Sequence, residues 1–315
     1  GMIYTLTLNP AVGWELQIDH FELNSDSRSN HSQIDCGGKG FNVSRMLRNL
    51  KTNSVAMGFV GGKNGERLES GLQEQGVATD FTWIKGESRT NVSIVALDNA
   101  EHIKVNEPGP TVNADEIKAL TRQVESVLVP GDWWVLAGSL PPGVPPDIYA
   151  DFITIIENAG ANVILDTSGE ALGLGCKAKP FIIKPNIEEA QHLMASTCDS
   201  HATPSEIAKA IQKLGPKNVV ISLGKEGAIV ASDDQISHVS SPSIIEANPI
   251  GAGDAMVGGL VWGLSQEKSL PEALQCGIAC GAATASQHGT DMGTYDMVLE
   301  LLSQIQNSDE VSKSD

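Results

Sequence analysis

The chain has 315 residues, of which 41% are hydrophobic and 19% are charged, and its formal net charge is −18. This length can bury a large core, either in one big α/β domain or in two smaller ones. The acidic balance argues against nucleic acid and acidic membranes as partners, so a few local cations must hold any anionic substrate. No apolar run approaches a membrane span, and the first residues lack a signal-sequence pattern. We therefore expect a cytoplasmic protein without a nucleic-acid or membrane partner.

Apolar, β-rich runs alternate with amphipathic helical stretches along the chain. In chain order, buried parallel strands are predicted at residues 3–8, 54–60, 133–137, 163–166, 181–184 and 219–222. Helices are predicted at residues 42–50, 65–75, 113–127, 146–159, 187–194, 204–214, 255–264 and 278–287. This alternation is the pattern of a doubly wound α/β sheet.

Two stretches, near residues 15–36 and 80–106, break this alternation. Their short alternating segments are more typical of antiparallel strands, and they could form a small lid sheet beside the main sheet. We treat residues 2–304 as one domain. The polar segment 305–315 is predicted to be a mobile tail.

The turn at residues 248–255, Asn-Pro-Ile-Gly-Ala-Gly-Asp-Ala, places two glycines and a carboxylate where the apolar helix 255–264 begins. Free N–H groups and the positive end of the helix dipole favour an anion, and the glycines let it approach closely. A carboxylate aimed at a bound phosphate has an evident use only if Asp254 accepts a proton from an attacking hydroxyl. From these residues alone, a tight turn with an acid that offsets the dipole is the alternative.

Other distinctive segments follow the predicted strands. They lie at residues 7–11 (Thr-Leu-Asn-Pro-Ala), 37–43 (Gly-Gly-Lys-Gly-Phe-Asn-Val), 138–143 (Gly-Ser-Leu-Pro-Pro-Gly), 185–189 (Pro-Asn-Ile-Glu-Glu) and 222–227 (Ser-Leu-Gly-Lys-Glu-Gly). Ligands of open α/β sheets gather at the carboxyl ends of the strands, which is where these segments fall. The sequence contains neither a Gly-x-x-x-x-Gly-Lys-Ser/Thr loop nor a strand-linked Gly-x-Gly-x-x-Gly motif.

This ordered set strongly resembles the ribokinase-like sugar kinases of the PfkB family, over essentially residues 3–302. Within the family it is most similar to the 1-phosphofructokinase and tagatose-6-phosphate kinase branch. The resemblance implies an α/β fold, a three-layer α/β/α sandwich with a mostly parallel sheet and a small β lid. It also implies a carbohydrate kinase that uses ATP and Mg²⁺ and acts on a phosphorylated ketohexose. Homodimers through the lid are common in this family, which allows one here.

Carried onto matching positions, the resemblance makes Asp254 the catalytic base. It makes the turn Gly251, Ala252, Gly253, Asp254 an anion hole, in which the N–H groups of the last three residues stabilise the transferring phosphoryl group. Lys184, Asn186 and Glu189 match the family's Lys-Pro-Asn-x-x-Glu, near the triphosphate, with Asn186 and Glu189 at the metal. For Glu189 an ordinary first-turn helix acid is the alternative.

The resemblance implies a nucleotide site in the later part of the chain. An ordinary hairpin is the alternative for the loop 222–227, and close helix packing is the alternative for the small-residue helix 278–287. Besides Lys184 and Asn186, the matching cofactor-binding residues are Ser222, Gly224, Gly227, Gly253, Ala282 and Ser286, with Gly289 beside the adenine.

For the substrate phosphate the resemblance suggests three cations from separate segments, namely Arg28, Lys39 and Arg89. Arginine in particular suits bidentate phosphate recognition. Solvated surface charge is the alternative for them, and helix capping is the alternative for Asn42. The implied substrate-binding residues are Arg28, Gly38, Lys39, Asn42, Arg89 and Ser139.

One departure concerns the acceptor side. The family has Asp at the position of Gly13, where a carboxylate binds sugar hydroxyls, and Lys104 replaces a commonly acidic residue. The acceptor therefore stays open among fructose 1-phosphate, at its 6-hydroxyl, and tagatose 6-phosphate or fructose 6-phosphate, at the 1-hydroxyl. Alternatives are a kinase of an unphosphorylated sugar or nucleoside, and a catalytically idle sugar-phosphate sensor. The retained Asp254 and Glu189 oppose the idle alternative.

Overall fold

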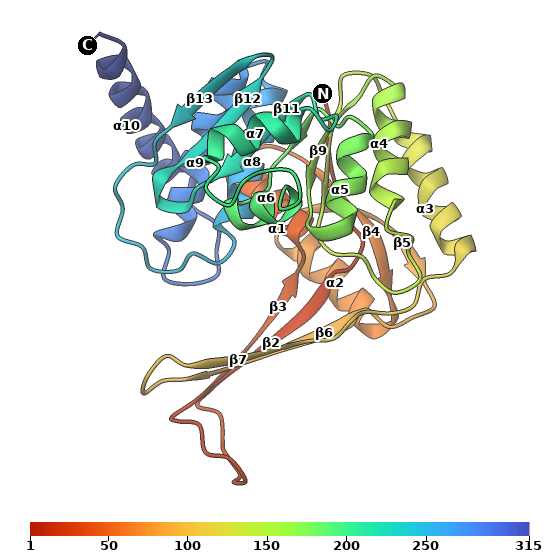
Figure 1. The fold of residues 1–315 in the computed structure, drawn as a ribbon. Coiled ribbons are helices and arrows are strands. Elements are labelled where there is room, and N and C mark those ends of the chain that lie inside the picture. Colours follow the sequence, from red (N-terminus) through yellow and green to blue (C-terminus); the bar gives the residue numbers. More distant parts are fainter. Residues whose placement is uncertain (315) are drawn as a thin grey trace.

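A single nine-stranded sheet organises the main body, in the order β13-β12-β11-β10-β9-β8-β1-β4-β5 (Figure 1). The structure is a computed structural model that describes residues 1–314, with the side chains of residues 1–308. Strands β5 to β11 in that order pair in parallel, and β12 and β13 add an antiparallel edge. The strands are β1 (Ile3–Thr7), β4 (Val55–Gly61), β5 (Ala78–Ile84), β8 (Trp133–Ala137), β9 (Asn162–Asp166), β10 (Ile182–Ile183), β11 (Asn218–Ser222), β12 (Ala228–Ser232) and β13 (Gln235–Val239).

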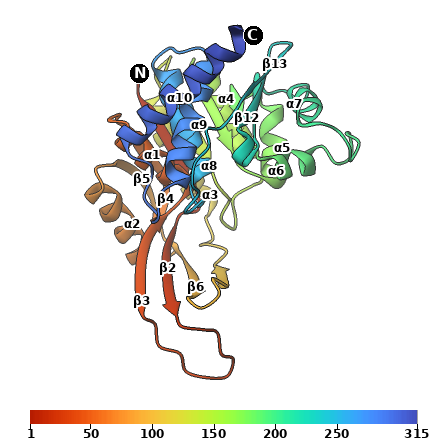
Figure 2. The same cartoon turned by 90° about the vertical axis from the view of Figure 1, so that its left-hand side faces the viewer.

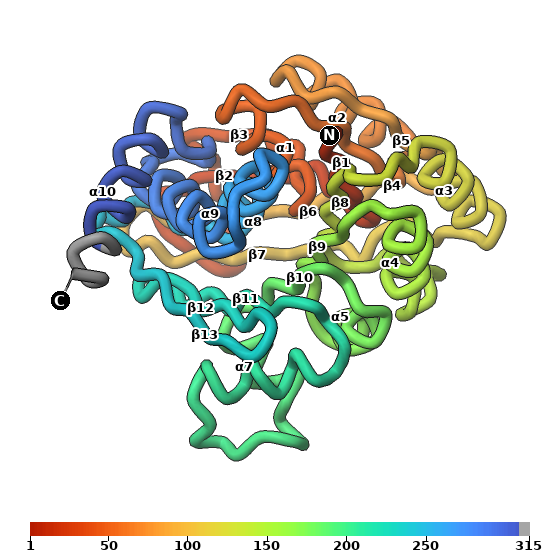
Figure 3. Tube along the Cα trace, turned by 90° about the horizontal axis from the view of Figure 1, so that it is seen from above, coloured from red at the N-terminus to blue at the C-terminus, as the bar shows by residue number. Residues whose placement is uncertain are grey.

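Helices cover both faces of this sheet (Figure 3). Helices α1, α8, α9 and α10 pack on one face and α3 to α7 on the other, while α2 packs beside α1 against β4 and β5. The helices are α1 (Lys39–Asn49), α2 (Gly62–Glu74), α3 (Ala114–Val127), α4 (Ile148–Asn158), α5 (Gly169–Lys177), α6 (Ile187–Leu193), α7 (Pro204–Gln212), α8 (Ala252–Ser265), α9 (Leu270–Ala285) and α10 (Tyr295–Ser314). The predicted three-layer α/β/α sandwich is confirmed.

The strand β8 shows why central strands are continuous apolar runs in the sequence. All five of its residues are buried. Successive side chains point to opposite faces, so Trp134 and Leu136 enter one core while Trp133 and Val135 enter the other. A strand covered on both faces has no position at which a polar side chain would reach water.

Four strands form a separate lid sheet in the order β3-β2-β6-β7, which extends from the main body as a long tongue (Figures 1 and 2). They are β2 (Ala11–Ile18), β3 (His31–Gly37), β6 (Arg89–Ala96) and β7 (His102–Asn106). The predicted small lid is confirmed. Strands β2 and β6 pair in parallel, whereas the two outer pairs are antiparallel.

The two faces of the lid differ in chemistry, and the strand register defines them. The apolar face carries the paired residues Leu16, Ile34, Val92, Ile94, Ile103 and Val105, and near the main body it continues through Val12 and Trp14 onto α2. The polar face carries Gly13, Gln33, Asp35, Arg89, Asn91 and Lys104. Directly paired residues point to the same side, so this division follows from the period of two.

Several predicted boundaries were wrong for identifiable reasons. Residues 80–84 belong to β5 of the main sheet, where they pair with β4, and not to the lid. They were misassigned because β5 is an edge strand that mixes exposed and buried positions. The antiparallel pair β12 and β13 and the helices α5 and α10 were not predicted. The predicted strand 181–184 is reduced to Ile182–Ile183.

Several helices begin earlier than predicted. Helices α1 and α8 each begin three residues before the predicted start, at Lys39 and Ala252, because glycines in their first turns do not prevent helix formation. Helix α9 begins at Leu270, where Ser269 and Glu272 form a capping box. Helix α10 continues to Ser314 through the segment predicted as a tail, whose mobility stays a prediction. Residue 315 lies outside the described residues. Within the described chain, no helix combines the length and apolar character needed to cross a membrane.

Candidate active site

The first turn of α8 is shaped by Gly251, which caps the helix with φ of 83°, in the left-handed region. Glycine adopts this conformation without the steric cost that a side chain would add. The N–H of Ala252 donates to the carbonyl of Pro249 at 3.1 Å, so it is already used. The N–H groups of Gly253 and Asp254 have no backbone acceptor among the described residues. Two free donors therefore remain at the positive end of the helix dipole.

A buried ammonium faces the same helix end. Lys184, directly after β10, is only 4% exposed. Its Nζ lies 3.8 Å from the position that a Cβ on Gly253 would occupy. A buried cation beside free N–H groups is an uncompensated concentration of positive charge, and an anion bound there would balance it.

The carboxylate of Asp254 is buried and held from two sides. Its Oδ2 accepts a 2.9 Å hydrogen bond from Asn42 Nδ2, and its Oδ1 lies 2.9 Å from Lys39 Nζ. The same ammonium lies 3.4 Å from Asp166 Oδ2 at the end of β9. Lys39 therefore bridges two buried carboxylates while its own side chain stays 43% exposed.

These contacts set the proton affinity of the group. Burial raises the pKa of Asp254 above its ordinary value and Asp166 raises it further, while Lys39 and Asn42 oppose the shift. Burial alone would lower the pKa of the Lys39 ammonium, but Asp166 and Asp254 outweigh it and raise that pKa. The arrangement pairs a carboxylate of raised basicity with a cation that stays charged. Such a carboxylate can accept a proton from a hydroxyl.

Asn42 lies within α1 and does not cap it, so the capping alternative is wrong. Its Oδ1 accepts a 3.0 Å hydrogen bond from Arg45, whose guanidinium also donates to the carbonyl of Cys36 in β3. The lid, α1 and Asp254 are thereby connected through a short series of hydrogen bonds. Gly38, which precedes α1, lies against Thr7 and leaves no room for a side chain without a shift.

The pair Asn186 and Glu189 forms a capping box at the start of α6. Asn186 Oδ1 accepts from the Glu189 N–H at 2.8 Å, and Glu189 Oε1 accepts from the Asn186 N–H at 3.0 Å. Glu189 is therefore an acidic residue in the first turn of a helix, as the alternative interpretation holds. Only Oε1 of Glu189 is occupied by the box, so Oε2 can still meet a hydrated Mg²⁺, and the residues fit that ion. Among the described residues no cluster of three or more His, Cys, Asp or Glu side chains forms a closed metal site.

The loop from Ser222 to Gly227 connects β11 to β12 as a hairpin, with the Leu223 N–H donating to the Gly227 carbonyl at 2.8 Å. The hairpin alternative is therefore right about the backbone. Gly227 has φ of 91°, and a Cβ there would lie 2.0 Å from the carbonyl oxygen of Val239. Ser222 also pairs with Asn186 in an isolated parallel bridge, which brings two of the predicted nucleotide residues together.

The two predicted residues of α9 lie near its end. Ala282 is buried, and the helix packs closely on α8, with a Cβ at Gly281 lying 3.2 Å from the Ala252 carbonyl oxygen. Ser286 donates to the Ala283 carbonyl at 2.7 Å. Close packing explains the small residues of α9, and the adenine contact, including that of Gly289, stays a prediction.

Arg89 lies where β6 begins and is half-buried. Its Nε donates to the Asn9 carbonyl at 3.2 Å and its Nη1 to the Glu107 carbonyl at 3.1 Å. The Asn9 side chain in turn donates to Ser139 Oγ at 3.4 Å and to the Pro108 carbonyl. The structure thus brings Arg89 and Ser139 together through Asn9, a residue without an individual role in the sequence interpretation.

Arg28 is the predicted residue that the fold does not bring to this site within one chain. It is exposed in the loop that follows the last residue of β2. Arg89 pairs with Ala11, the first residue of β2, so the length of this eight-residue strand separates the two arginines. At about 3.3 Å a residue, the separation is roughly 20 Å. The expected convergence of Arg28 with Lys39 and Arg89 is therefore wrong for a single chain.

Asp166 is a second site residue, after Asn9, that the sequence interpretation missed. It ends a predicted strand, at the same edge of the sheet as the residues that were found, and that position was a usable signal. Its acidic character also differs from the apolar residues before it.

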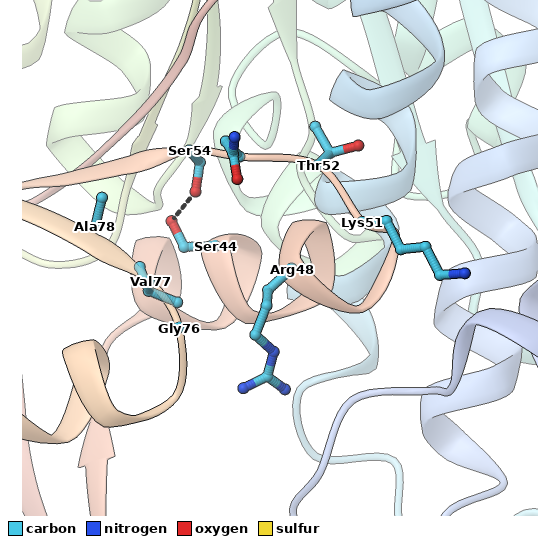
Figure 4. A pocket seen from close by; sticks show the side chains of 9 residues that line it. Ser44, Arg48, Lys51, Thr52, Ser54, Gly76, Val77 and Ala78 are labelled. Atoms are coloured by element: carbon cyan, nitrogen blue, oxygen red, sulfur yellow. Dashed lines mark hydrogen bonds between the residues drawn. The ribbon is translucent and has the colours of Figure 1, made fainter.

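A cavity of about 210 Å³ lies elsewhere, at the amino ends of β4 and β5 (Figure 4). Ser54 and Ser44 hydrogen-bond to each other in its wall at 2.9 Å, and Arg48 donates to the Gln75 carbonyl at 2.6 Å. It lies beside the carboxyl-terminal ends of α1 and α2, where helix dipoles disfavour anions. The cavity is therefore distinct from the site around Asp254.

The chain is similar to carbohydrate kinases along nearly its whole length. The family model "pfkB family carbohydrate kinase" matches residues 6–295. The chain is 35% identical over 304 residues to 1-phosphofructokinase of Bacillus subtilis, covering 96% of this chain and 98% of the relative. It is 32% identical over 309 residues to tagatose-6-phosphate kinase of Staphylococcus epidermidis, covering 97% and 99%.

Solved structures agree with the sequence relatives. Phosphofructokinase-2 from Escherichia coli, in complex with potassium, superposes with a TM-score of 0.90 at 29% identity, covering 97% of this chain and 99% of that one. The ribokinase-like fold and the resemblance inferred from the motifs are confirmed. Because the family model and the relatives span nearly the whole chain, this protein belongs to the pfkB family of carbohydrate kinases.

Proposed function

We propose that the protein transfers the γ-phosphoryl group of ATP to a hydroxyl of a phosphorylated ketohexose. The observation that carries this proposal is that the first turn of α8 holds both the buried Asp254 carboxylate and, at Gly253, a backbone position that the Lys184 ammonium faces. A base and an anion site at one helix end are what phosphoryl transfer to a hydroxyl requires. Relatives named for fructose 1-phosphate and tagatose 6-phosphate kinases support the acceptor class.

In the proposed mechanism, the oxygen of the acceptor hydroxyl forms a bond to the γ-phosphorus while Asp254 accepts the proton of that hydroxyl. The bond between that phosphorus and the β,γ-bridging oxygen breaks, and ADP leaves. The N–H groups of Gly253 and Asp254 and the ammonium of Lys184 stabilise charge on the phosphoryl oxygens. Lys39 keeps Asp254 oriented, and its side chain is exposed enough to contact the acceptor.

Mg²⁺, when bound with ATP, neutralises charge on the triphosphate oxygens. Asn186 and Glu189 would hold it through their side-chain oxygens and bridging water. Ser222, Gly224 and Gly227, together with Ala282 and Ser286, would line the nucleotide.

Arg89 and Lys39 would bind the phosphate that the acceptor already carries, with Ser139 beside them. Guanidinium and ammonium groups from separate elements make a selective anion site on an acidic chain. Fructose 1-phosphate, tagatose 6-phosphate and fructose 6-phosphate are the candidate acceptors. The retained base and anion site favour a kinase over an idle sensor.

An ATP-consumption screen with Mg²⁺ tests the proposal against phosphosugars, free sugars and nucleosides. We expect turnover with a phosphoketohexose, and we expect Asp254→Asn to lower kcat by about 10²–10⁴-fold. The exposed Asp234→Asn is the matched control and should keep wild-type kcat. Binding of phosphosugars without turnover of any acceptor would identify an idle sensor. Turnover of free sugars or nucleosides alone would identify the other alternative.

We further propose that two chains associate through the apolar face of the lid. Ile103 and Val105 there are 48% and 60% exposed, and Ile34 is 42% exposed, although they pair with apolar neighbours. A second copy presents the same apolar face, which makes a symmetric contact self-complementary. In sedimentation, Ile103→Lys should shift the protein to monomer, whereas Lys104→Gln, its neighbour on the polar face, should leave the mass unchanged. A wild-type monomer at all concentrations would reject this contact.

A further inference from the structure

We infer that Asp35 on β3 is the carboxylate that recognises the acceptor's hydroxyls, in a gap that Gly13 leaves open on the polar face of the lid. The inference rests on the proposed function and deepens it, because it assigns a specificity residue to the acceptor side. Asp35 has no role in the sequence interpretation.

The first observation is the row of three positions across the lid. Gly13 in β2 pairs with Asp35 in β3 on one side and with Asn91 in β6 on the other. Paired residues point to the same side of a sheet, so Asp35 and Asn91 flank a central position without a side chain. A Cβ built on Gly13 finds its nearest atom at 3.7 Å, the Asp35 carbonyl oxygen. The gap is therefore open space between two polar side chains.

The second observation is that the polar groups beside the gap can accept further hydrogen bonds. Asn91 Oδ1 is buried and has no hydrogen-bond partner among the described residues. The Asp35 carboxylate accepts from Gln33 Nε2 at 3.1 Å through each oxygen, which leaves further lone-pair directions on both. A ligand rich in hydroxyl donors would satisfy both groups, since a buried oxygen without a partner is costly.

The third observation is the direction of this face. The opposite face of β2 packs on α2 through Val12 and Trp14, so Gly13 points away from α2. Gln33 donates to Thr290 Oγ1 at 3.3 Å, in the loop whose Met292 lies against Gly251. The polar face is thereby fixed toward the segment that adjoins the first turn of α8.

The neighbouring contacts point the same way. Cys36, next to Asp35, accepts from Arg45, and Arg45 donates to Asn42, which donates to Asp254. Arg89, two residues before Asn91 on the same face, carries the proposed phosphate contact. A phosphosugar held by Arg89 would lie along the row with its hydroxyls over Gly13. Asp35 then supplies from β3 the acceptor carboxylate that β2 lacks.

The test compares acceptor and ATP kinetics in Asp35→Asn, using the phosphoketohexose that the wild type turns over best. We expect the acceptor KM to rise about 10- to 100-fold, because a hydrogen bond to a charged group is lost. The KM for ATP should stay within about twofold of wild type. Asp98→Asn, the same charge change at an exposed end of the lid, is the control and should leave both KM values unchanged.

A relocation variant separates recognition from a merely structural role. The open space at Gly13 accepts a side chain, so Gly13→Asp with Asp35→Asn moves the carboxylate one strand across the same row. We expect this double variant to recover most of the acceptor KM, with a melting temperature like that of Asp35→Asn. A double variant no better than Asp35→Asn would overturn the assignment of the gap.

The outcomes also separate this inference from the proposed function. Wild-type turnover of a phosphoketohexose with an unchanged acceptor KM in Asp35→Asn would overturn the role of Asp35 and leave the kinase proposal intact. No wild-type turnover of any phosphoketohexose would overturn both. A higher KM for both the acceptor and ATP in Asp35→Asn would also overturn the role of Asp35, because it would indicate a structural role.

Discussion

The Nζ of Lys39 lies 2.9 Å from Oδ1 of Asp254 and joins the first turn of α1 to the first turn of α8. Because the same ammonium lies 3.4 Å from Asp166, the proposed base belongs to a group of one cation and two buried carboxylates. Its proton affinity depends on both neighbours, and each can be removed separately.

Removal of the cation should change the pH dependence in a defined direction. Lys39 lowers the pKa of Asp254 against the effect of burial, so Lys39→Met leaves that pKa higher. The base works deprotonated, and activity falls as pH falls through its pKa. The acid limb of kcat should therefore move to higher pH. An unchanged limb in a kcat–pH profile would show that another group titrates there.

Removal of the second carboxylate should have the opposite effect. Asp166 raises the pKa of Asp254 by charge repulsion, so Asp166→Asn should move the acid limb to lower pH. The paired variants form a test of sign that does not depend on absolute rates. Movement of both limbs in the same direction would contradict the coupling.

Asp254 should also limit stability. Its pKa is higher in the folded chain than its ordinary value, so its ionised form is disfavoured by folding. The stability it contributes is therefore lost as pH rises through the shifted pKa. At neutral pH, Asp254→Asn should melt at the same temperature as wild type or above it. The measurement is thermal unfolding at pH 5 and at pH 8, and a large loss of stability at pH 8 would contradict it.

Two glycines of the same turn should respond differently to alanine. Gly251 has positive φ, so Gly251→Ala should cost about 1–2 kcal/mol of unfolding free energy. Gly253 lies in the helix and is exposed, so Gly253→Ala should not destabilise the fold. Its methyl group would instead occupy the space before Lys184 and lower kcat/KM for ATP by about 10²-fold. Denaturant unfolding and steady-state kinetics on both variants check this.

The buried ammonium of Lys184 should strengthen nucleotide binding and lower the stability of the unliganded protein. Lys184→Met removes a buried charge, so the unliganded variant should melt at a temperature equal to or above wild type. Its KM for ATP should rise about 10-fold or more. The increase in melting temperature with ATP should shrink accordingly. An undiminished increase would show that Lys184 does not contact the nucleotide.

The capping box at α6 allows the metal role to be separated from the capping role. Glu189→Gln keeps the reciprocal hydrogen bonds with Asn186 but removes the charge. We expect unchanged stability and about a 10-fold higher Mg²⁺ concentration for half-maximal activity. Glu116→Gln makes the same change in the box at α3, away from the site, and is the control. Equal Mg²⁺ dependence in the two variants would reject the metal role.

The sequence predicted the strands that carry the site because buried parallel strands are continuous apolar runs. The polar residues at or shortly after their carboxyl ends, such as Ser222 and Asn186, were correspondingly easy to find. Strand β5 could not be told from a lid strand, because an edge strand and a lid strand are both exposed on one side.

The contacts between segments were less accessible from sequence. The ion pair of Lys39 with Asp166 joins residues far apart in the chain, and the register of the lid decides that Asp35 lies opposite Gly13. Neither relation has a local pattern, since both depend on how separate elements meet. Arg28 shows the reverse error, where a motif suggested proximity that the length of β2 prevents.

The two-faced lid has a consequence for how this kinase can change. Since neighbouring residues of a strand point to opposite sides, a one-residue insertion within β2 would exchange the positions beyond it between the polar and apolar faces. The proposed acceptor contacts and the proposed subunit contact would then be lost in a single step. Substitution within a row, such as an exchange of carboxylate between β2 and β3, changes one face and leaves the other intact. Lineages of this fold should therefore vary the lid in composition and preserve its length.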